Sequence, residues 1–265
     1  MFRRVIIVLS ICIFGLISPT LAETIGKIVG VDGSPSVSGP SGQHKLVVCD
    51  KISENDKITV TTGNAQVLFV DGTKLVVGPG SSLTINKYLM QGGGSTASNF
   101  SIKALRGTFR FITGQSPKSA YNIQTANATI GIRGTGFDFW VNQFTGVAVL
   151  KGKVKLCNKS GGRACVNLNQ NCELGTTENG GAKKVSGENQ GLRLRNHLPF
   201  ILNQSRLIQS FRLDVKSCQP ALDAAATTEG NNKLGPQYNT PRKDSFPISD
   251  ISPGPGRCDT GGPDC

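Results

Sequence analysis

The chain has 265 residues, of which 37% are hydrophobic and 6% are aromatic, and it carries a formal net charge of +12. This positive charge favours anionic partners. Because the lysines and arginines are scattered along the sequence and few aromatic residues are available for stacking, we expect no specific nucleic-acid binding, and solubility is the simplest role for the charge.

The first 22 residues have the features of a cleaved secretory signal peptide. Arg3 and Arg4 precede an apolar run over residues 5–17, which is too short to span a bilayer comfortably, and small residues precede the cleavage position after Ala22. An uncleaved N-terminal anchor is the alternative. Cleavage removes two arginines and no acid, so the net charge falls from +12 to +10. We expect a mature chain without a transmembrane segment, located in the periplasm or secreted.

Residues 23–187 are predicted to form one all-β domain. Short runs of β-forming residues alternate with turn residues, and helical periodicity is absent. Asp71-Gly72 lies between two such runs, and this dipeptide suits a two-residue type I′ hairpin turn. Arg106-Gly107 and Lys151-Gly152 are predicted to join two further strand pairs. The pattern is typical of a β-sandwich or a β-helical roll of many short strands.

The sequence pattern changes after residue 187. Pro199 stands where a first helical residue would lie and apolar residues then recur near one face, so we expect one amphipathic helix over residues 188–217. Packing of this helix on the β domain is the simpler interpretation, and contact with a partner or a membrane is the alternative. Residues 218–265 hold seven of the thirteen prolines, so we expect a disordered tail that folding does not require.

Seven cysteines follow the signal peptide, namely Cys49, Cys157, Cys165, Cys172, Cys218, Cys258 and Cys265. Their spacings do not match a zinc site, so disulfides are expected in an oxidising compartment, and the odd number leaves at least one cysteine unpaired, metal-bound or intermolecular. Cys157 ends one β-run and Cys165 begins the next, so a bridge is predicted between them. A second bridge is predicted between Cys49 and Cys172, although Cys172 could compete for either of the first two. Cys258 and Cys265 could close a small local loop.

The most unusual stretch is NIQTANATIGIRGTGFDFWV, residues 122–141, in which three glycines fall within six residues. The spacing of GIRGTG does not match the dinucleotide-binding or phosphate-binding fingerprints. We therefore interpret the glycines as a tight corner between two strands. Arg133 is expected to donate hydrogen bonds to backbone carbonyls or to Asp138. The alternation that follows predicts a buried face of apolar residues and an outward face that carries Asp138 and Trp140.

Catalytic chemistry finds little support in the sequence. His44 lies in a hydrophilic loop, His197 precedes the predicted helix, and the seventeen carboxylates are dispersed, with only Asp138 inside the glycine-rich stretch. A hydrolase built on paired carboxylates stays open as a third hypothesis, because its partners could be distant in sequence. We expect no enzymatic activity, no cofactor and no bound metal ion.

The stretch TANATIGIRGTGFDFWV, followed by TGVAVLKGKVKL, resembles the signature of the FecR domain family. Upstream, GKIVGVDGSPSV, VLFVDGTKLVV and SLTINKY resemble the family's opening strands and its F-x-D-G-T hairpin, so the resemblance covers residues 25–176. The motif positions that we interpret as structural are Gly131, Arg133, Gly134, Thr135, Gly136 and Phe137.

The resemblance implies an all-β domain in the bacterial periplasm or exported space. The best-known members of the family are membrane-spanning sigma-factor regulators, whose external part contacts an outer-membrane iron-siderophore receptor. This sequence shows no cytoplasmic anti-sigma domain and no internal transmembrane helix, and Gly136 stands where the family usually has glutamate. What remains is the expectation of a stand-alone exported FecR-domain protein.

Two functions follow as hypotheses. The leading one is a non-enzymatic protein-binding module that contacts an envelope protein in cell-envelope signalling or assembly. The alternative is a module that binds an anionic glycan or the envelope surface, as the positive charge of the mature chain favours.

Overall fold

A computed structural model describes residues 23–91, 94–159 and 164–231. Its strands form two sheets of nine described strands each, and the long strand β9 (Ala97–Ile112) belongs to both. Sheet A contains, in order, β4 (Lys51–Ser53), β1 (Thr24–Gly33), β6 (Gly63–Phe69), β7 (Lys74–Val77), β9, β12 (Gly136–Val141), β13 (Thr145–Lys151), β16 (Leu174–Thr176) and β17 (Lys183–Val185). Sheet B contains, in order, β3 (Gly42–Lys45), β2 (Ser36–Gly39), β5 (Lys57–Val60), β8 (Ser81–Met90), β9, β10 (Tyr121–Gln124), β11 (Ala128–Ile132), β14 (Val154–Asn158) and β15 (Cys165–Leu168).

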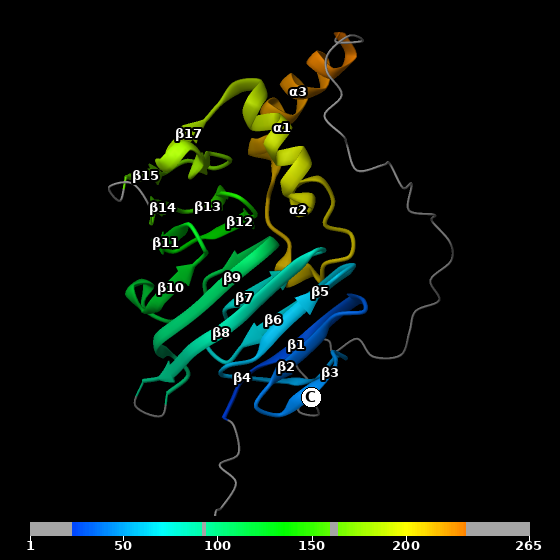
Figure 1. Ribbon diagram of the computed structural model, residues 1–265, viewed down its shortest axis with the longest axis vertical. Helices are drawn as coiled ribbons and strands as arrows, with labels where there is room; N and C mark the ends of the chain where they lie inside the picture. The colour runs from blue at the N-terminus through cyan, green and yellow to red at the C-terminus, as the bar shows by residue number, and fades with distance from the viewer. Residues whose placement is uncertain (1–22, 92–93, 160–163, 232–265) are drawn as a thin grey trace, which may run out of the picture.

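The chain winds between these two layers as it proceeds, from β1–β4 at one end of the molecule to β13–β17 at the other (Figure 1). Strands pair antiparallel in the described part of both sheets except β9 and β10, which run parallel. One large apolar core fills the space between the sheets, and its aromatic members pack closely: the Phe100 ring lies 5.9 Å from Phe111 and 5.8 Å from Tyr121. The predicted all-β fold is therefore confirmed.

Strand β9 corrects one sequence-based expectation. Arg106-Gly107 was expected to separate two strands, but β9 runs through it without a break and passes from sheet B to sheet A. Gly107 has a φ of +102°, and a Cβ at this position would lie 2.3 Å from the Cα of Ser81. Glycine is needed here because the strand changes layers against the neighbouring backbone, not because the chain reverses.

The hairpin at Asp71-Gly72 joins β6 and β7, but its turn is not the expected two-residue type I′. Phe69 donates its backbone N–H to the Thr73 carbonyl, and of the loop residues 70–72 only Gly72 has a positive φ, +80°. This is the pattern of a three-residue loop that ends in a glycine bulge. The Asp71 side chain is buried and accepts hydrogen bonds from the hydroxyls of Thr73, Ser116 and Tyr121 at 2.8, 2.6 and 3.0 Å.

The region after residue 187 also differs from expectation. In place of one helix over 188–217, the chain forms α1 (Gly187–His197), α2 (Pro199–Leu202) and two short 3₁₀ turns, η3 (Gln209–Phe211) and η4 (Lys216–Cys218). Leu198 and Pro199 interrupt the helix, because the residue before a proline avoids the α conformation. Part of the expected tail is helical as well, as α3 (Gln219–Asn231), and residues 232–265 lie outside the described part of the chain.

Residues 187–231, here called the clamp, cover the outer face of sheet A. Two apolar clusters join them to the sheet. The first contains Trp140, Ala148, Leu150, Cys172, Leu174, Leu194, Leu198, Ile201, Cys218 and Leu222, and the second contains Val29, Val76, Phe200, Leu207 and Phe211. Asp138 and Trp140, which the sequence predicts to face outward, do leave the central core, but they are 0% and 2% exposed because the clamp lies over them.

Arg110 of β9 lies at the centre of this contact and is completely buried. It stands directly opposite Asp138 of β12, and the two side chains form a bidentate ion pair with N–O distances of 2.6 and 2.8 Å. Its remaining hydrogens bind the clamp: the side-chain oxygen of Gln204 and the backbone carbonyls of Phe200 and Phe211. All five donors of the guanidinium group are therefore occupied.

Two disulfides are described. The predicted bridge between Cys157 and Cys165 is present and joins the paired strands β14 and β15. The predicted bridge between Cys49 and Cys172 is wrong: Cys172 pairs with Cys218, 46 positions later, and Cys49 is also disulfide-bonded. In the chain-entropy account, a loop of this length corresponds to about 4 kcal/mol of stabilisation. The candidate pair Cys258 and Cys265 lies outside the described residues.

The buried ion pair generates a stability prediction. Asp138→Leu leaves the Arg110 guanidinium charged and unpaired inside the protein, so we expect a loss of about 3–5 kcal/mol of unfolding free energy. The double variant Arg110→Met/Asp138→Leu removes both charges and should recover part of that loss. Urea denaturation of the purified protein measures both quantities.

The matched control is Asp32→Ala, which breaks the exposed pair between Arg206 and Asp32. An exposed pair typically contributes about 0.2–1 kcal/mol, so this variant should lose much less stability. If Asp138→Leu lost no more stability than Asp32→Ala, the buried ion pair would not stabilise the domain more than an exposed pair does.

Candidate functional site

The glycine-rich motif forms the crossing from β11 in sheet B to β12 in sheet A. Gly134 adopts a φ of +72°, in the left-handed region that glycine favours. The crossing packs against the β13–β14 turn: a Cβ on Gly152 would lie 2.0 Å from the Gly134 carbonyl oxygen, and the Arg133 N–H donates to the Lys153 carbonyl at 3.1 Å. The backbone N–H of Thr135 donates to the Thr113 hydroxyl at 3.1 Å.

The other two glycines of the motif have different surroundings. A Cβ on Gly136 would come within 2.7 Å of Leu213, so this glycine makes room for the clamp. A Cβ on Gly131 would meet nothing nearer than the Lys155 carbonyl at 3.6 Å, and its φ lies outside the left-handed region. The fold therefore gives no steric or conformational reason for glycine at position 131.

Arg133 and Phe137 lie apart although the sequence places them close together. The Phe137 side chain is buried in the central core, 5.7 Å from the Phe111 ring. The Arg133 side chain is exposed and forms no hydrogen bond with a described residue. The expected contact between Arg133 and Asp138 is wrong because Asp138 lies across the crossing, in sheet A, and is bound by Arg110.

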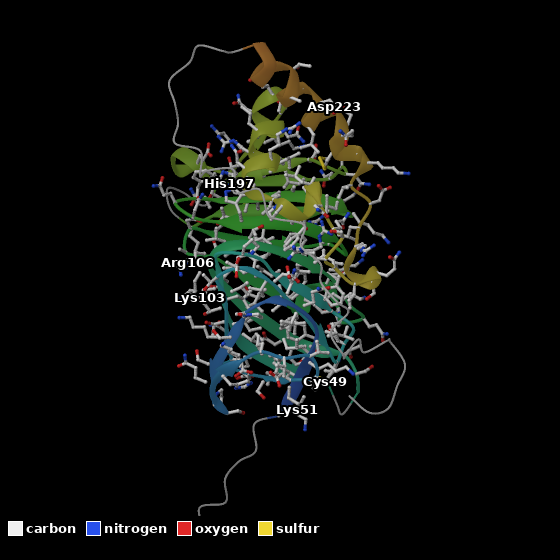
Figure 2. The ribbon with its side chains drawn as sticks, turned by 90° about the vertical axis from the view of Figure 1, so that its right-hand side faces the viewer. Cys49, Lys51, Lys103, Arg106, His197 and Asp223 are labelled. Atoms are coloured by element: carbon white, nitrogen blue, oxygen red, sulfur yellow. A yellow bond between two sulfur atoms is a disulfide. The ribbon has the colours of Figure 1, made fainter. Side chains whose placement is uncertain are left out.

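The outer face of sheet B, unlike that of sheet A, is not covered by the clamp. Strand pairing aligns one residue from each of five neighbouring strands in a row across this face, in the order Lys57, Thr84, Lys103, Gln124 and Thr129. Both lysines in the row are exposed, whereas the neighbours on either side point into the core. Lys103 and Arg106 lie on the same side of the molecule (Figure 2).

The charge on this face is of one sign. The nine described strands of sheet B contain no aspartate or glutamate. Apart from Arg110, which lies in the sheet A part of β9, their cations are Lys45, Lys57, Lys87, Lys103, Arg106 and Lys155. The spacing of the cations along the chain does not reveal this concentration, because they lie on separate strands. The signal was present: residues 72–172 hold twelve lysines and arginines and one acid, Asp138.

A hollow of about 460 Å³ opens on the same face. Polar side chains, backbone and one disulfide cysteine line it: Ser98, Asn99, Ser119, Ala120, Tyr121, Asn122, Thr129, Ile130, Gly131, Lys155 and Cys157. Its volume lies within the range of small-molecule sites in proteins, about 300–1,000 Å³. Because Gly131 has no side chain, the hollow is open at that position.

The two histidines have local partners and lie far from this hollow in the fold. His44 of β3 lies 3.4 Å from the Asp50 carboxylate. His197 of α1 stacks on the Trp140 ring at 4.7 Å, and burial together with nearby Arg193 lowers its pKa. In the described part of the chain, no group of three or more His, Cys, Asp and Glu side chains is arranged to hold a metal ion.

The left-handed backbone of Gly134 at the β11–β12 crossing generates a second stability prediction. Gly134→Val forces a β-branched residue into a left-handed backbone conformation, so we expect a loss of about 1–3 kcal/mol of unfolding free energy. Gly131→Val is the matched control, because position 131 has an ordinary φ and an added Cβ would make only ordinary van der Waals contacts, at 3.6 Å or more. Thermal denaturation compares the two variants. Equal melting temperatures for Gly134→Val and the unmodified protein would contradict a structural role for this glycine.

Comparisons with known proteins agree with the motif. The model of the family described as FecR protein matches residues 56–155, from the start of β5 into β14. No curated protein matches the chain. The described helices include none with the length and apolar character that a membrane crossing requires.

Two solved structures resemble the fold, both crystal structures of candidate anti-sigma factors from Parabacteroides distasonis ATCC 8503. The first is 20% identical, with 52% of this chain and 63% of that chain covered and a TM-score of 0.38. This chain thus spans less than two thirds of the first structure's length. The second is 18% identical, with 66% and 91% covered and a TM-score of 0.39. Residues 56–155 are therefore identified as a FecR domain.

Proposed function

We propose that this protein is a non-enzymatic, exported module that contacts an envelope protein in cell-envelope signalling or assembly. The FecR domain over residues 56–155 carries the proposal. The resemblance of its motifs to the FecR family implies a domain that works by binding another protein outside the cytoplasm. The rigid two-sheet core and the clamp support this role, since they present broad surfaces at fixed positions.

The partners of the buried ionisable groups support a role without catalysis. A catalytic acid or base has to reach the substrate proton that it transfers. Asp138 is instead bound by Arg110, and Asp71 is bound by three hydroxyl groups. His197 packs between Trp140 and Phe144, at 4.7 and 6.4 Å. Each of these side chains has a structural partner in the fold.

The disulfides support export. Cys157–Cys165 and Cys172–Cys218 are structural bridges, and such bridges persist mainly in oxidising compartments. Together with the signal-like features of residues 1–22, they favour the periplasm or the extracellular space.

The second candidate function is binding of an anionic glycan or of the envelope surface. One observation favours it: the strands of sheet B that the structure describes carry cations and no acids.

Photo-crosslinking in living cells tests the leading proposal. A photoreactive amino acid is placed, one variant at a time, at Asn122 on sheet B, at Lys183 on the edge strand β17, or at Asp223 on α3, all of which are exposed. Because a protein partner contacts one patch, we expect one of these surfaces to give a discrete adduct with a single envelope protein. The other two positions and an unirradiated sample are the controls. The absence of a discrete protein adduct from all three surfaces would contradict the proposal.

A further inference from the structure

The outer face of sheet B carries charged groups that form no ion pair within the described part of the fold. Lys57, Lys103 and Lys155 are exposed, and none of them forms an ion pair within the described residues. Lys57 and Lys103 lie two strand spacings apart, about 10 Å, in one row across the sheet. Thr84 lies between the two lysines in this row, and Gln124 and Thr129 follow Lys103, so hydroxyl and amide groups lie beside the charges.

The positive charges on this face also act on one another. The Lys159 ammonium group donates to the Thr125 carbonyl at 2.7 Å and to the Gln124 side chain at 3.3 Å, at the edge of the row. Burial lowers the pKa of Lys159, and the neighbouring charge of Lys103 lowers it further. An anion bound here would relieve this repulsion.

A protein partner fits the face poorly. Protein interfaces are centred on aromatic and other apolar side chains and are depleted in lysine and serine. Of the large hydrophobic residues that are exposed in the described part of the chain, sheet B contributes only Leu89 and Leu105, at 45% and 37% exposure. The outer face therefore lacks the apolar centre that a stable protein contact requires.

Nucleic acid fits poorly as well. Single strands bind by stacking their bases on aromatic side chains. The aromatic residues in the sheet B part of the described strands are Tyr88, Phe100 and Tyr121. They are at most 5% exposed, and all belong to the inner core. A polymer of anionic sugars needs no such stacking, because its carboxylates pair with lysines and its hydroxyls bond to threonine, asparagine and glutamine.

The space left by Gly131 indicates where one sugar of such a polymer would bind. The fold requires neither its φ nor its lack of a side chain, yet a larger residue there would project into the hollow that Asn122 and Lys155 help to line. We propose that the outer face of sheet B binds a linear acidic polysaccharide, with Lys57, Lys103 and Lys155 contacting its anionic groups and the hollow beside Gly131 receiving one sugar ring. This activity is independent of the proposed protein partner.

Binding to polygalacturonate tests the proposal directly. The purified protein is titrated with this carboxylate polymer and with its methyl-esterified, neutral form, each in low and in high salt. We expect binding of the acidic form alone, weakened by salt because exposed charges are screened. A phosphate-bearing lipopolysaccharide is the second probe, and it shows whether the anionic groups are carboxylates or phosphates.

Two matched triple variants distinguish binding by this face from an effect of the protein's net charge. Lys57→Gln/Lys103→Gln/Lys155→Gln removes three charges from sheet B, and Lys51→Gln/Lys151→Gln/Lys183→Gln removes three exposed charges elsewhere. Because each exposed ion pair contributes a few-fold in affinity, we expect about a tenfold loss for the first variant and little change for the second. Equal losses in the two variants would show that only net charge matters and would overturn the proposal.

Gly131→Leu tests the hollow without disturbing the fold. Its melting temperature should match that of the unmodified protein, while its affinity for polygalacturonate falls several-fold. Unchanged affinity would overturn the placement of the sugar. The absence of binding to both acidic probes would overturn the whole inference, and so would binding of polyglutamate as tight as that of polygalacturonate, which would indicate an acidic protein instead. Neither result would affect the crosslinking test of the protein partner.

Discussion

A single buried arginine governs how this protein is put together. Arg110 sits in the middle of sheet A at 0% exposure, and a guanidinium group at such a place must have every donor satisfied. Asp138 on the next strand supplies two acceptors, and the clamp supplies three more through Gln204, Phe200 and Phe211. Burial raises the pKa of Asp138, and the contact with Arg110 opposes that shift. The sheet is therefore incomplete without the clamp.

This constraint makes the two faces of the sandwich different. The clamp covers the outer face of sheet A, where Gln66 accepts from the Ile208 N–H and donates to the Arg206 carbonyl. The Cys172–Cys218 bridge ties η4 of the clamp to the turn before β16. Four of the five described ion pairs lie in sheet A or the clamp. Within the described residues, the lysines of sheet B form no ion pairs. One face is thus used for folding, and the other is free to bind.

The sequence predicts local features well and distant contacts poorly. The β-type runs, the glycine corner at Gly134 and the bridge between Cys157 and Cys165 depend on neighbours within a few residues, and patterning can detect them. Arg110 and Gln204 are 94 positions apart, so nothing near Asp138 reveals that its outward face is covered. The acid-poor composition of residues 72–172 indicates a positively charged region. The row of lysines itself cannot be found in the sequence, because its members lie on separate strands that only the sheet brings together.

Hydrogen exchange of backbone amides tests most directly whether the clamp is an integral part of the domain. The backbone N–H groups of Ile208 and Leu213 donate to side-chain oxygens of Gln66 and Gln204, both at 2.9 Å. If Arg110 holds the clamp in place, these two amides should open only with the whole domain and exchange as slowly as those of the neighbouring strand β7. Exchange of Ile208 and Leu213 within seconds, while the amides of β7 stay protected, would contradict it.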